Sequence, residues 1–273
     1  MELEQKDLSR MLETAIVAAR LAGQRAMEEI SFVKASVKNA TELVTQADAR
    51  CQQIIVDRIK ENYPDHGFIA EEGGQEKVFK QQPRGAQPFW WAIDPIDGTN
   101  NFAHRLPLFA ISIATLHKGE PIVGVIFEPA TDSMFTAVKG REAQLNGRRI
   151  TASKEKMDKF SSVGLDSHFE FDNGLPGWVC EIIRRTRFRN LGTTSLQIAY
   201  VAKGSLVGTI VSTPKLWDIA AGAVIAETAG AVMSDWQGKR IFPVDVDSYQ
   251  GEEFQVVTAN KKVHPQIVEL LKK

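Results

Sequence analysis

The sequence predicts a mixed protein of α-helices and β-strands with two lobes, an N-terminal α+β lobe over residues 1–150 and a C-terminal α/β lobe over residues 151–273. Before residue 150, consecutive β-rich runs are separated by short turns, which is typical of antiparallel strands. After Thr151, strands and helices alternate, which is typical of an α/β lobe. The chain has 273 residues, 43% of them hydrophobic, so it can bury a full core. No linker separates the lobes, which are expected to pack as one unit.

The chain opens with an amphipathic helix, because apolar residues recur at three- and four-residue steps from residue 8 to residue 26. The spacing Thr45-x-x-Asp48 is that of a capping box and predicts the start of a second helix. A short strand over residues 67–70 ends in the acidic pair Glu71-Glu72. The polar segment over residues 75–87 is expected to be a loop.

The most informative stretch runs from Trp90 to Phe102. It begins with the period-two alternation of a buried strand, which is expected to break at Pro95 and Gly98. Proline fixes its own φ and biases its predecessor to extended geometry, so Asp94 and Asp97 can converge. Two converging carboxylates share a proton or hold a cation. Gly98 and Thr99 then offer N–H groups and a hydroxyl at the start of a helix, where phosphate binds. Together these features indicate phosphoryl chemistry, and a solvated Asp-Gly turn is the alternative.

The rest of the chain completes the two lobes. Antiparallel strands are predicted over residues 108–116, 121–127 and 133–138, and Asn146-Gly147 predicts a hairpin turn. The second half is predicted to contain strands over residues 161–165, 188–191, 231–234 and 254–258, and helices over residues 175–185, 194–203 and 264–271. A further apolar helix is expected to run to Gly230 with Asp218 as its N-cap.

Two motifs resemble a known family. Asp94-Pro95-Ile96-Asp97-Gly98-Thr99 and Trp217-Asp218-Ile219-Ala220-Ala221-Gly222 resemble the signatures of the inositol monophosphatase superfamily of Mg²⁺-dependent, lithium-sensitive phosphatases. The resemblance extends from about Thr45 to Gly230. It implies an α-β-α-β-α sandwich of the inositol monophosphatase and fructose-1,6-bisphosphatase type, and a homodimer. It also implies a phosphoric monoester hydrolase that acts on inositol 1-phosphate or a related phosphorylated polyol or sugar by direct attack of activated water.

The resemblance also assigns roles to individual residues. The metal ligands it implies are Glu71, Asp94, the Ile96 carbonyl, Asp97 and Asp218, and the catalytic residues are Thr99, Asp48 and Glu71. It implies substrate contacts from Asp97, Gly98, Thr99, Gly192, Thr193, Thr194 and Asp218. All these ligands are hard oxygens, which select Mg²⁺, with Mn²⁺ as the alternative. The resemblance implies two or three Mg²⁺ ions. Three of the acids also have simpler interpretations: Asp48 as a capping-box acid, Glu71 as part of an exposed turn, and Asp218 as a helix cap.

The substrate is less well defined. In animal-type relatives a glutamate seven residues before the signature aspartate contacts inositol hydroxyls, and the corresponding position here is Val211. We therefore expect broader or shifted specificity. Fructose 1,6-bisphosphate, histidinol phosphate and 3′-phosphoadenosine nucleotides are the alternative substrates within the superfamily.

Composition limits the partners. The formal net charge is −1, from 33 basic and 34 acidic side chains, so charge indicates neither a nucleic-acid nor a membrane partner. A regulatory role with the transcription machinery, known for bacterial relatives, is the alternative from another class. The basic cluster over residues 184–189 is either a solvated helix end or a group with a dimer-interface or substrate role. The charged first dozen residues and the lone Cys51 and Cys180 predict a cytoplasmic protein without a signal peptide, disulfide framework or zinc site.

Overall fold

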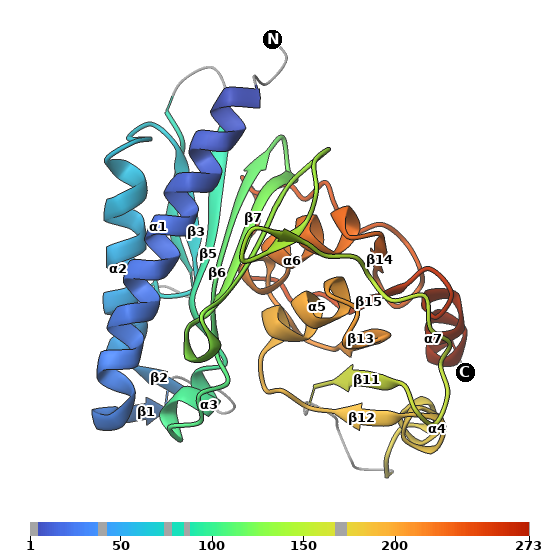
Figure 1. Ribbon diagram of the computed structural model, residues 1–273. Coiled ribbons are helices and arrows are strands. Elements are labelled where there is room, and N and C mark those ends of the chain that lie inside the picture. The colour runs from blue at the N-terminus through green and yellow to red at the C-terminus, as the bar shows by residue number, and fades with distance from the viewer. Residues whose placement is uncertain (1–4, 38–42, 74–77, 85–87, 167–173, 273) are drawn as a thin grey trace.

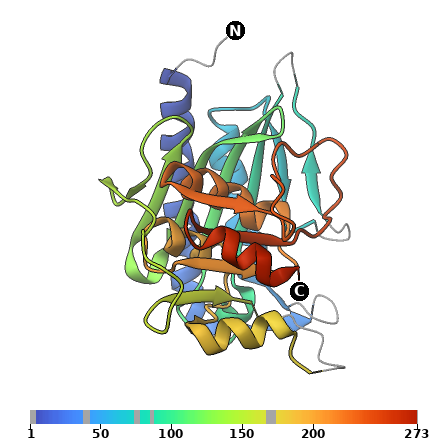
Figure 2. The same ribbon diagram turned by 90° about the vertical axis from the view of Figure 1, so that its right-hand side faces the viewer.

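Helices and sheets alternate in five layers in the computed structural model, which describes residues 5–37, 43–73, 78–84, 88–166 and 174–272. From left to right in Figure 1, the layers are helices α1 (Gln5–Glu29) and α2 (Gln46–Lys60), a first sheet, helices α5 (Thr194–Ala202) and α6 (Leu216–Thr228), a second sheet, and helices α4 (Gly177–Arg185) and α7 (His264–Leu271). Figure 2 shows α4 and α7 in front of the second sheet. The predicted α-β-α-β-α sandwich is confirmed.

The first sheet is antiparallel except for the parallel pair of β3 and β5. Its strands lie in the order β10 (Arg148–Arg149), β9 (Gln144–Leu145), β8 (Ser133–Val138), β7 (Glu120–Glu128), β6 (Ala110–His117), β5 (Phe89–Asp97), β3 (Gly67–Ala70) and β4 (Phe79–Gln81). The predicted antiparallel strands and the hairpin are confirmed. The expected loop over residues 75–87 is corrected by β4, a half-buried edge strand whose Phe-Lys-Gln sequence is too short to show alternation; residues 74–77 and 85–87 lie outside the described ranges.

The second sheet is mixed. Its order is β12 (Arg187–Arg189), β11 (Ser162–Leu165), β13 (Gly208–Val211), β15 (Val256–Asn260) and β14 (Ala231–Ser234). Strands β12, β11 and β13 are parallel, whereas β15 runs antiparallel to both of its neighbours. Strand β13 was not predicted from the sequence, because its four buried residues lack alternation. A small antiparallel pair, β1 (Ala35–Val37) and β2 (Leu43–Thr45), precedes α2.

The largest buried cluster lies between the first sheet and helices α5 and α6, so it contains residues from both halves of the chain. Small residues bring these layers close together: a Cβ atom on Gly124 of β7 would lie 2.5 Å from the carbonyl oxygen of Ala221 in α6. The proposed lobe boundary at residue 150 therefore divides the two sheets but not the core. Among the described helices, none has the length and apolar character needed to cross a membrane.

Candidate active site

A cavity of about 510 Å³ lies where the end of β5 meets the N-terminal ends of α5 and α6. Its lining includes all the predicted metal and substrate residues: Glu71, Asp94, Ile96, Asp97, Gly98, Thr99, Gly192, Thr193, Thr194 and Asp218. Asp48 does not line the cavity, but it is completely buried and contacts Thr99. Residues from segments that are spread between positions 71 and 218 of the sequence thus meet at this cavity.

Strand β5 carries the first two acids, Asp94 and Asp97. All nine of its residues are buried, and the strand continues through Pro95 to Asp97, which corrects the expected break at Pro95. Asp94 pairs with Ser112 and Asp97 pairs with Ala110, with a shift of register between them. Proline has no N–H group to contribute to the ladder, so the strand bulges at this point. The bulge directs both carboxylates into the cavity, and the N–H of Ile96 donates to Asp94 Oδ1 at 3.0 Å.

Asp97 is fixed by the second half of the chain. Its Oδ2 accepts hydrogen bonds from the Thr193 hydroxyl at 2.6 Å and from the Ser195 N–H at 2.5 Å. Thr193 is also the N-cap of α5 and accepts a hydrogen bond from the N–H of Leu196. Burial raises the pKa of Asp97, and these hydrogen bonds oppose that effect. The hydrogen bonds of Asp97 therefore join the end of β5 to the start of α5.

A second contact between the halves forms the rim of the cavity. The amide of Asn101, in the short helix α3 (Thr99–Ala103), donates to the carbonyl oxygens of Leu108 and Leu191, at 2.7 Å each. Gly192 has a φ of 67°, and a Cβ atom there would lie 2.6 Å from Asn101 Nδ2. Only glycine fits this position without displacing the asparagine. Helix α3 begins at Thr99 as predicted, but a single turn adds little helix dipole to phosphate binding.

Asp218 comes from α6. The predicted N-cap role is wrong: α6 begins at Leu216 with Lys215 as the N-cap, and Asp218 is the third helical residue. Its Oδ2 accepts a hydrogen bond of 2.7 Å from the N–H of Lys215, which is how an acid at this position caps a helix. The carboxyl groups of Asp94 and Asp218 are close enough for each to shift the pKa of the other.

The acids oppose one another electrostatically. Burial raises the pKa of Asp94 well above its ordinary value of 3.8, and Glu71, Asp97 and Asp218 raise it further. Burial raises the pKa of Asp218 in the same way, with Asp97 and Glu71 as the next causes. Neighbouring buried carboxyl groups share a proton or hold a cation. A divalent cation would relieve this repulsion, and the all-oxygen donor set fits Mg²⁺.

The described residues do not form a compact ion site. Within those ranges, no three or more His, Cys, Asp and Glu side chains come together closely enough to hold a metal ion as they stand. Asp97 and Asp218 instead bond to the backbone N–H groups of Ser195 and Lys215. The predicted ligands therefore line one cavity without converging on one point.

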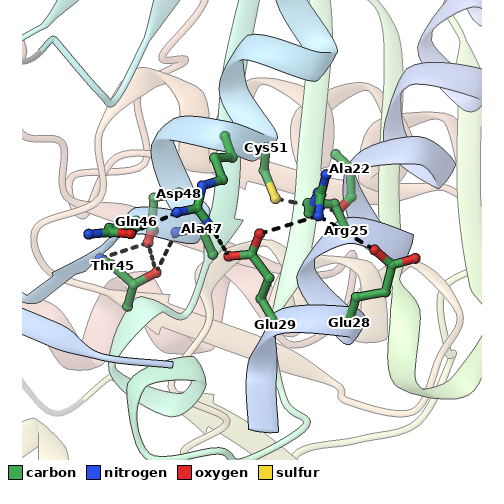
Figure 3. Close-up of polar contacts among 10 residues, drawn as sticks. Ala22, Arg25, Glu28, Glu29, Thr45, Gln46, Ala47, Asp48 and Cys51 are labelled. Atoms are coloured by element: carbon green, nitrogen blue, oxygen red, sulfur yellow. Dashed lines mark hydrogen bonds and ion pairs between the residues drawn. The ribbon is translucent and has the colours of Figure 1, made fainter. Parts of the chain in front are cut away.

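Asp48 caps helix α2, as one interpretation of the sequence predicted, and it also contacts Thr99. Figure 3 shows it at the start of α2, where its Oδ2 accepts hydrogen bonds from the N–H and the hydroxyl of Thr45, at 2.9 and 2.5 Å. The capping box is confirmed. The other oxygen, Oδ1, lies 3.1 Å from the Thr99 hydroxyl, which is also 3.0 Å from the Ile96 carbonyl oxygen. Burial raises the pKa of Asp48 to about 6, against the hydrogen bonds from Thr45.

Gln52 is a site residue that the sequence analysis missed. It lies one turn after Asp48 on the buried face of α2, and its amide forms two hydrogen bonds with the backbone of Glu72: Nε2 donates to the carbonyl oxygen at 2.8 Å, and Oε1 accepts from the N–H at 2.9 Å. These bonds fix the segment that carries Glu71. The four-residue spacing from Asp48 is the signal that could have identified it.

The basic cluster lies away from the cavity. Arg184 and Arg185 at the end of α4 both form ion pairs with Glu181, and Arg187 and Arg189 are exposed on the edge strand β12. None of these four arginines lines the cavity, which removes the basis for a direct role in binding substrate. Val211, by contrast, does line it.

Comparisons with known proteins identify the family of this chain. The model of the inositol monophosphatase family matches residues 7–273. The chain is 36% identical to Nus factor SuhB of Pseudomonas aeruginosa over 85% of this chain and 88% of that protein, and 34% identical to inositol-1-monophosphatase of Mesorhizobium japonicum over 84% and 87%. The structure of the Thermotoga maritima IMPase matches with a TM-score of 0.83 at 30% identity, over 96% of this chain and 97% of that one. From its fold, its cavity and these matches, we conclude that the chain belongs to the inositol monophosphatase family.

Proposed function

We propose that the protein is a Mg²⁺-dependent phosphomonoesterase that hydrolyses inositol 1-phosphate or a related small phosphorylated polyol or sugar. One observation carries this proposal: in a chain of this family, four acids from distant segments, Glu71, Asp94, Asp97 and Asp218, line a single cavity. These four acids repel a phosphate dianion unless a cation lies between the acids and the phosphate.

The rate acceleration that phosphate ester hydrolysis needs supports a metal-dependent mechanism. Hydrolysis of a phosphate monoester needs acceleration of up to about 10²¹-fold, whereas one general base supplies about 10²–10⁴-fold. Glu71, Asp94, Asp97, Asp218 and the Ile96 carbonyl would hold two or three Mg²⁺ ions, with Mn²⁺ as an alternative. Bound Mg²⁺ supplies the positive charge that polarises the phosphate and makes water acidic enough to attack.

The chain's own residues orient the reactants. The Thr99 hydroxyl, held by Asp48 and the Ile96 carbonyl, would position the attacking water, and Asp48 would accept its proton. A carboxyl group with a pKa of about 6 is suited to accept a proton near neutral pH. The N–H groups of Gly98 and Thr99 would contact the phosphate, and Gly192, Thr193 and Thr194 would contact the alcohol, since all of them line the cavity.

The decisive experiment measures inorganic phosphate released from a panel of esters, with and without Mg²⁺. The panel contains inositol 1-phosphate, glycerol 2-phosphate, fructose 1,6-bisphosphate, histidinol phosphate and 3′-phosphoadenosine nucleotides. Inositol 1-phosphate is placed first because the Mesorhizobium japonicum relative is named inositol-1-monophosphatase. We expect release that requires Mg²⁺ and is inhibited by lithium. No release from any ester would overturn the proposal.

A second role has a specific observation in its favour. The relative from Pseudomonas aeruginosa, like those from Escherichia coli and Vibrio cholerae, is named Nus factor SuhB. We therefore propose, as an additional function, that a homodimer of this protein binds the transcription machinery through a surface outside the cavity. Light scattering tests the dimer, and co-purification with RNA polymerase tests the binding. Binding that persists in the Asp94→Asn variant would separate this role from catalysis.

A further inference from the structure

One wall of the cavity carries two polar side chains that the proposed reaction does not use, Asp166 and Gln197. Asp166 directly follows β11, and β11 pairs in parallel with β13 such that Leu165 lies opposite Ile210. One residue further along, Asp166 follows β11 and lies level with Val211 of β13. The Asp166 carboxylate is thus located beside Val211, at the same edge of the second sheet.

The position of Asp166 is fixed by hydrogen bonds. Its Oδ2 accepts from both the N–H and the hydroxyl of Ser212, at 2.6 Å each. Ser212 directly follows Val211, so these two bonds hold the carboxylate beside the apolar side chain. A carboxylate held in this way at a cavity wall is a preorganised acceptor for a hydroxyl group.

Gln197 approaches the same wall from α5. Its side chain is only 1% exposed, and its Oε1 is buried without a hydrogen-bond partner among the described residues. The position that a Cβ atom would take on Gly164 lies 2.9 Å from Gln197 Oε1 and 2.7 Å from the Thr209 hydroxyl, so the absence of a side chain at Gly164 makes room for the amide. Gly164 and Asp166 are two residues apart along an extended chain, so their side-chain positions share one face. An unpaired buried polar group is destabilising, and a hydrogen bond from a ligand hydroxyl would remove that cost.

We propose that Asp166 and Gln197 bind hydroxyl groups of the substrate's alcohol portion and thereby select phosphorylated polyols over esters without hydroxyls. This inference rests on the proposed phosphatase function and specifies its substrate class. A site that hydrogen-bonds a substrate hydroxyl discriminates strongly, because the wrong substrate leaves its polar groups unpaired. Val211 cannot make such bonds, so on this wall the discrimination comes from the neighbouring strand and from α5.

The test compares kcat/KM for inositol 1-phosphate with kcat/KM for phenyl phosphate, which has no hydroxyl groups. Asp166→Asn keeps an acceptor for Ser212 but removes the charge, and Gln197→Leu removes the amide at similar volume. We expect each variant to lower the ratio of the two values by about tenfold, with phenyl phosphate turned over at a rate within about twofold of wild type. Glu253→Gln is the matched control, because it removes an exposed carboxylate from the rim of the same cavity and should leave the ratio unchanged.

Thermal unfolding of each variant identifies a loss caused by misfolding, which would lower both values equally. A ratio that stays within about twofold of wild type in both variants would overturn the inference, whatever the absolute rates. A wild-type protein that releases phosphate from phenyl phosphate but not preferentially from inositol 1-phosphate would also overturn it, while leaving the phosphatase proposal in place. Absence of release from every ester would overturn both.

Discussion

The carboxylate of Asp97, at the end of β5, accepts a hydrogen bond of 2.5 Å from the N–H of Ser195 in the first turn of α5. These two residues are 98 positions apart in the sequence. Their contact joins a strand of the first sheet to a helix of the middle layer, and the cavity lies at this junction. The geometry of the acids therefore depends on how the two halves pack.

Asp94→Asn should abolish turnover and raise the thermal stability of the metal-free protein. The substitution removes one acid from a buried group whose members raise each other's pKa, so the repulsion in the folded state falls. A gain of about 1 kcal/mol corresponds to an increase of about 2–4 °C in Tm for a protein of this size. Phosphate release and thermal unfolding in EDTA measure the two effects. An Asp94→Asn variant with full activity would contradict the metal assignment.

Thr99→Ala should lower kcat by about 10²–10⁴-fold and leave Mg²⁺ affinity nearly unchanged, because the hydroxyl orients the water rather than the metal. Thr99→Ser, which keeps the hydroxyl, should recover most of the rate. Steady-state kinetics across a Mg²⁺ titration separates kcat from metal affinity. An equal loss of metal affinity in Thr99→Ala would show that the residue is a ligand or a structural contact.

Gln52→Ala should weaken Mg²⁺ binding by about 10–100-fold, the usual cost of removing a group that orients a ligand. The amide of Gln52 holds the backbone of Glu72, next to Glu71. Gln53→Ala is the matched control, because that neighbouring glutamine bonds to Asp57 on the exposed side of α2. Calorimetric titration with Mg²⁺ compares the two variants. If both bind Mg²⁺ like wild type, Glu71 does not depend on this contact.

The metal-free protein should lose stability as the pH rises from about 4 to about 7. Burial raises the pKa of Asp48 from 3.8 to about 6, so ionisation costs more in the folded state than in the unfolded state. Its contribution is present in full below the unfolded value and is lost as the pH rises through about 6, a change of about 3 kcal/mol. Asp94 and Asp218 act in the same direction. Urea unfolding in EDTA across this range should show a shallower decline for Asp48→Asn, and identical slopes would contradict the burial argument.

Wild-type enzyme should prefer inositol 1-phosphate over glycerol 2-phosphate, fructose 1,6-bisphosphate and histidinol phosphate by less than about a hundredfold, because Val211 cannot bond a hydroxyl. Val211→Glu alone should do little, since the new acid lies beside Asp166 and the two repel each other. Val211→Glu combined with Asp166→Asn should raise the preference for inositol 1-phosphate above that of either single variant. Additive effects in the double variant would show that the two positions do not interact.

Much of the fold follows from local patterns. Three such patterns are present in the structure: the three- and four-residue steps of α1, the capping box at Thr45 and the hairpin turn at Asn146-Gly147. Each depends on residues that are close together in the sequence. Short elements without such a pattern were missed. Strand β4 has three residues and pairs with the preceding strand β3, whereas β13 has four residues and pairs with β11 and β15, which are distant in sequence. Pro95 misled the prediction because a bulge can accommodate a proline within a strand.

For the candidate site, the acids could be predicted from local sequence, since Asp94, Asp97 and Asp218 belong to short motifs with recognisable chemistry. The surroundings of these acids depend on the tertiary structure. Strand order places Asp166 beside Val211. Helix packing places Gln197 beside Gly164 and Gln52 beside Glu72. A motif fixes which atoms are available within a few residues, whereas the hydrogen bonds and burial that orient those atoms come from segments brought together when the two sheets close around α5 and α6.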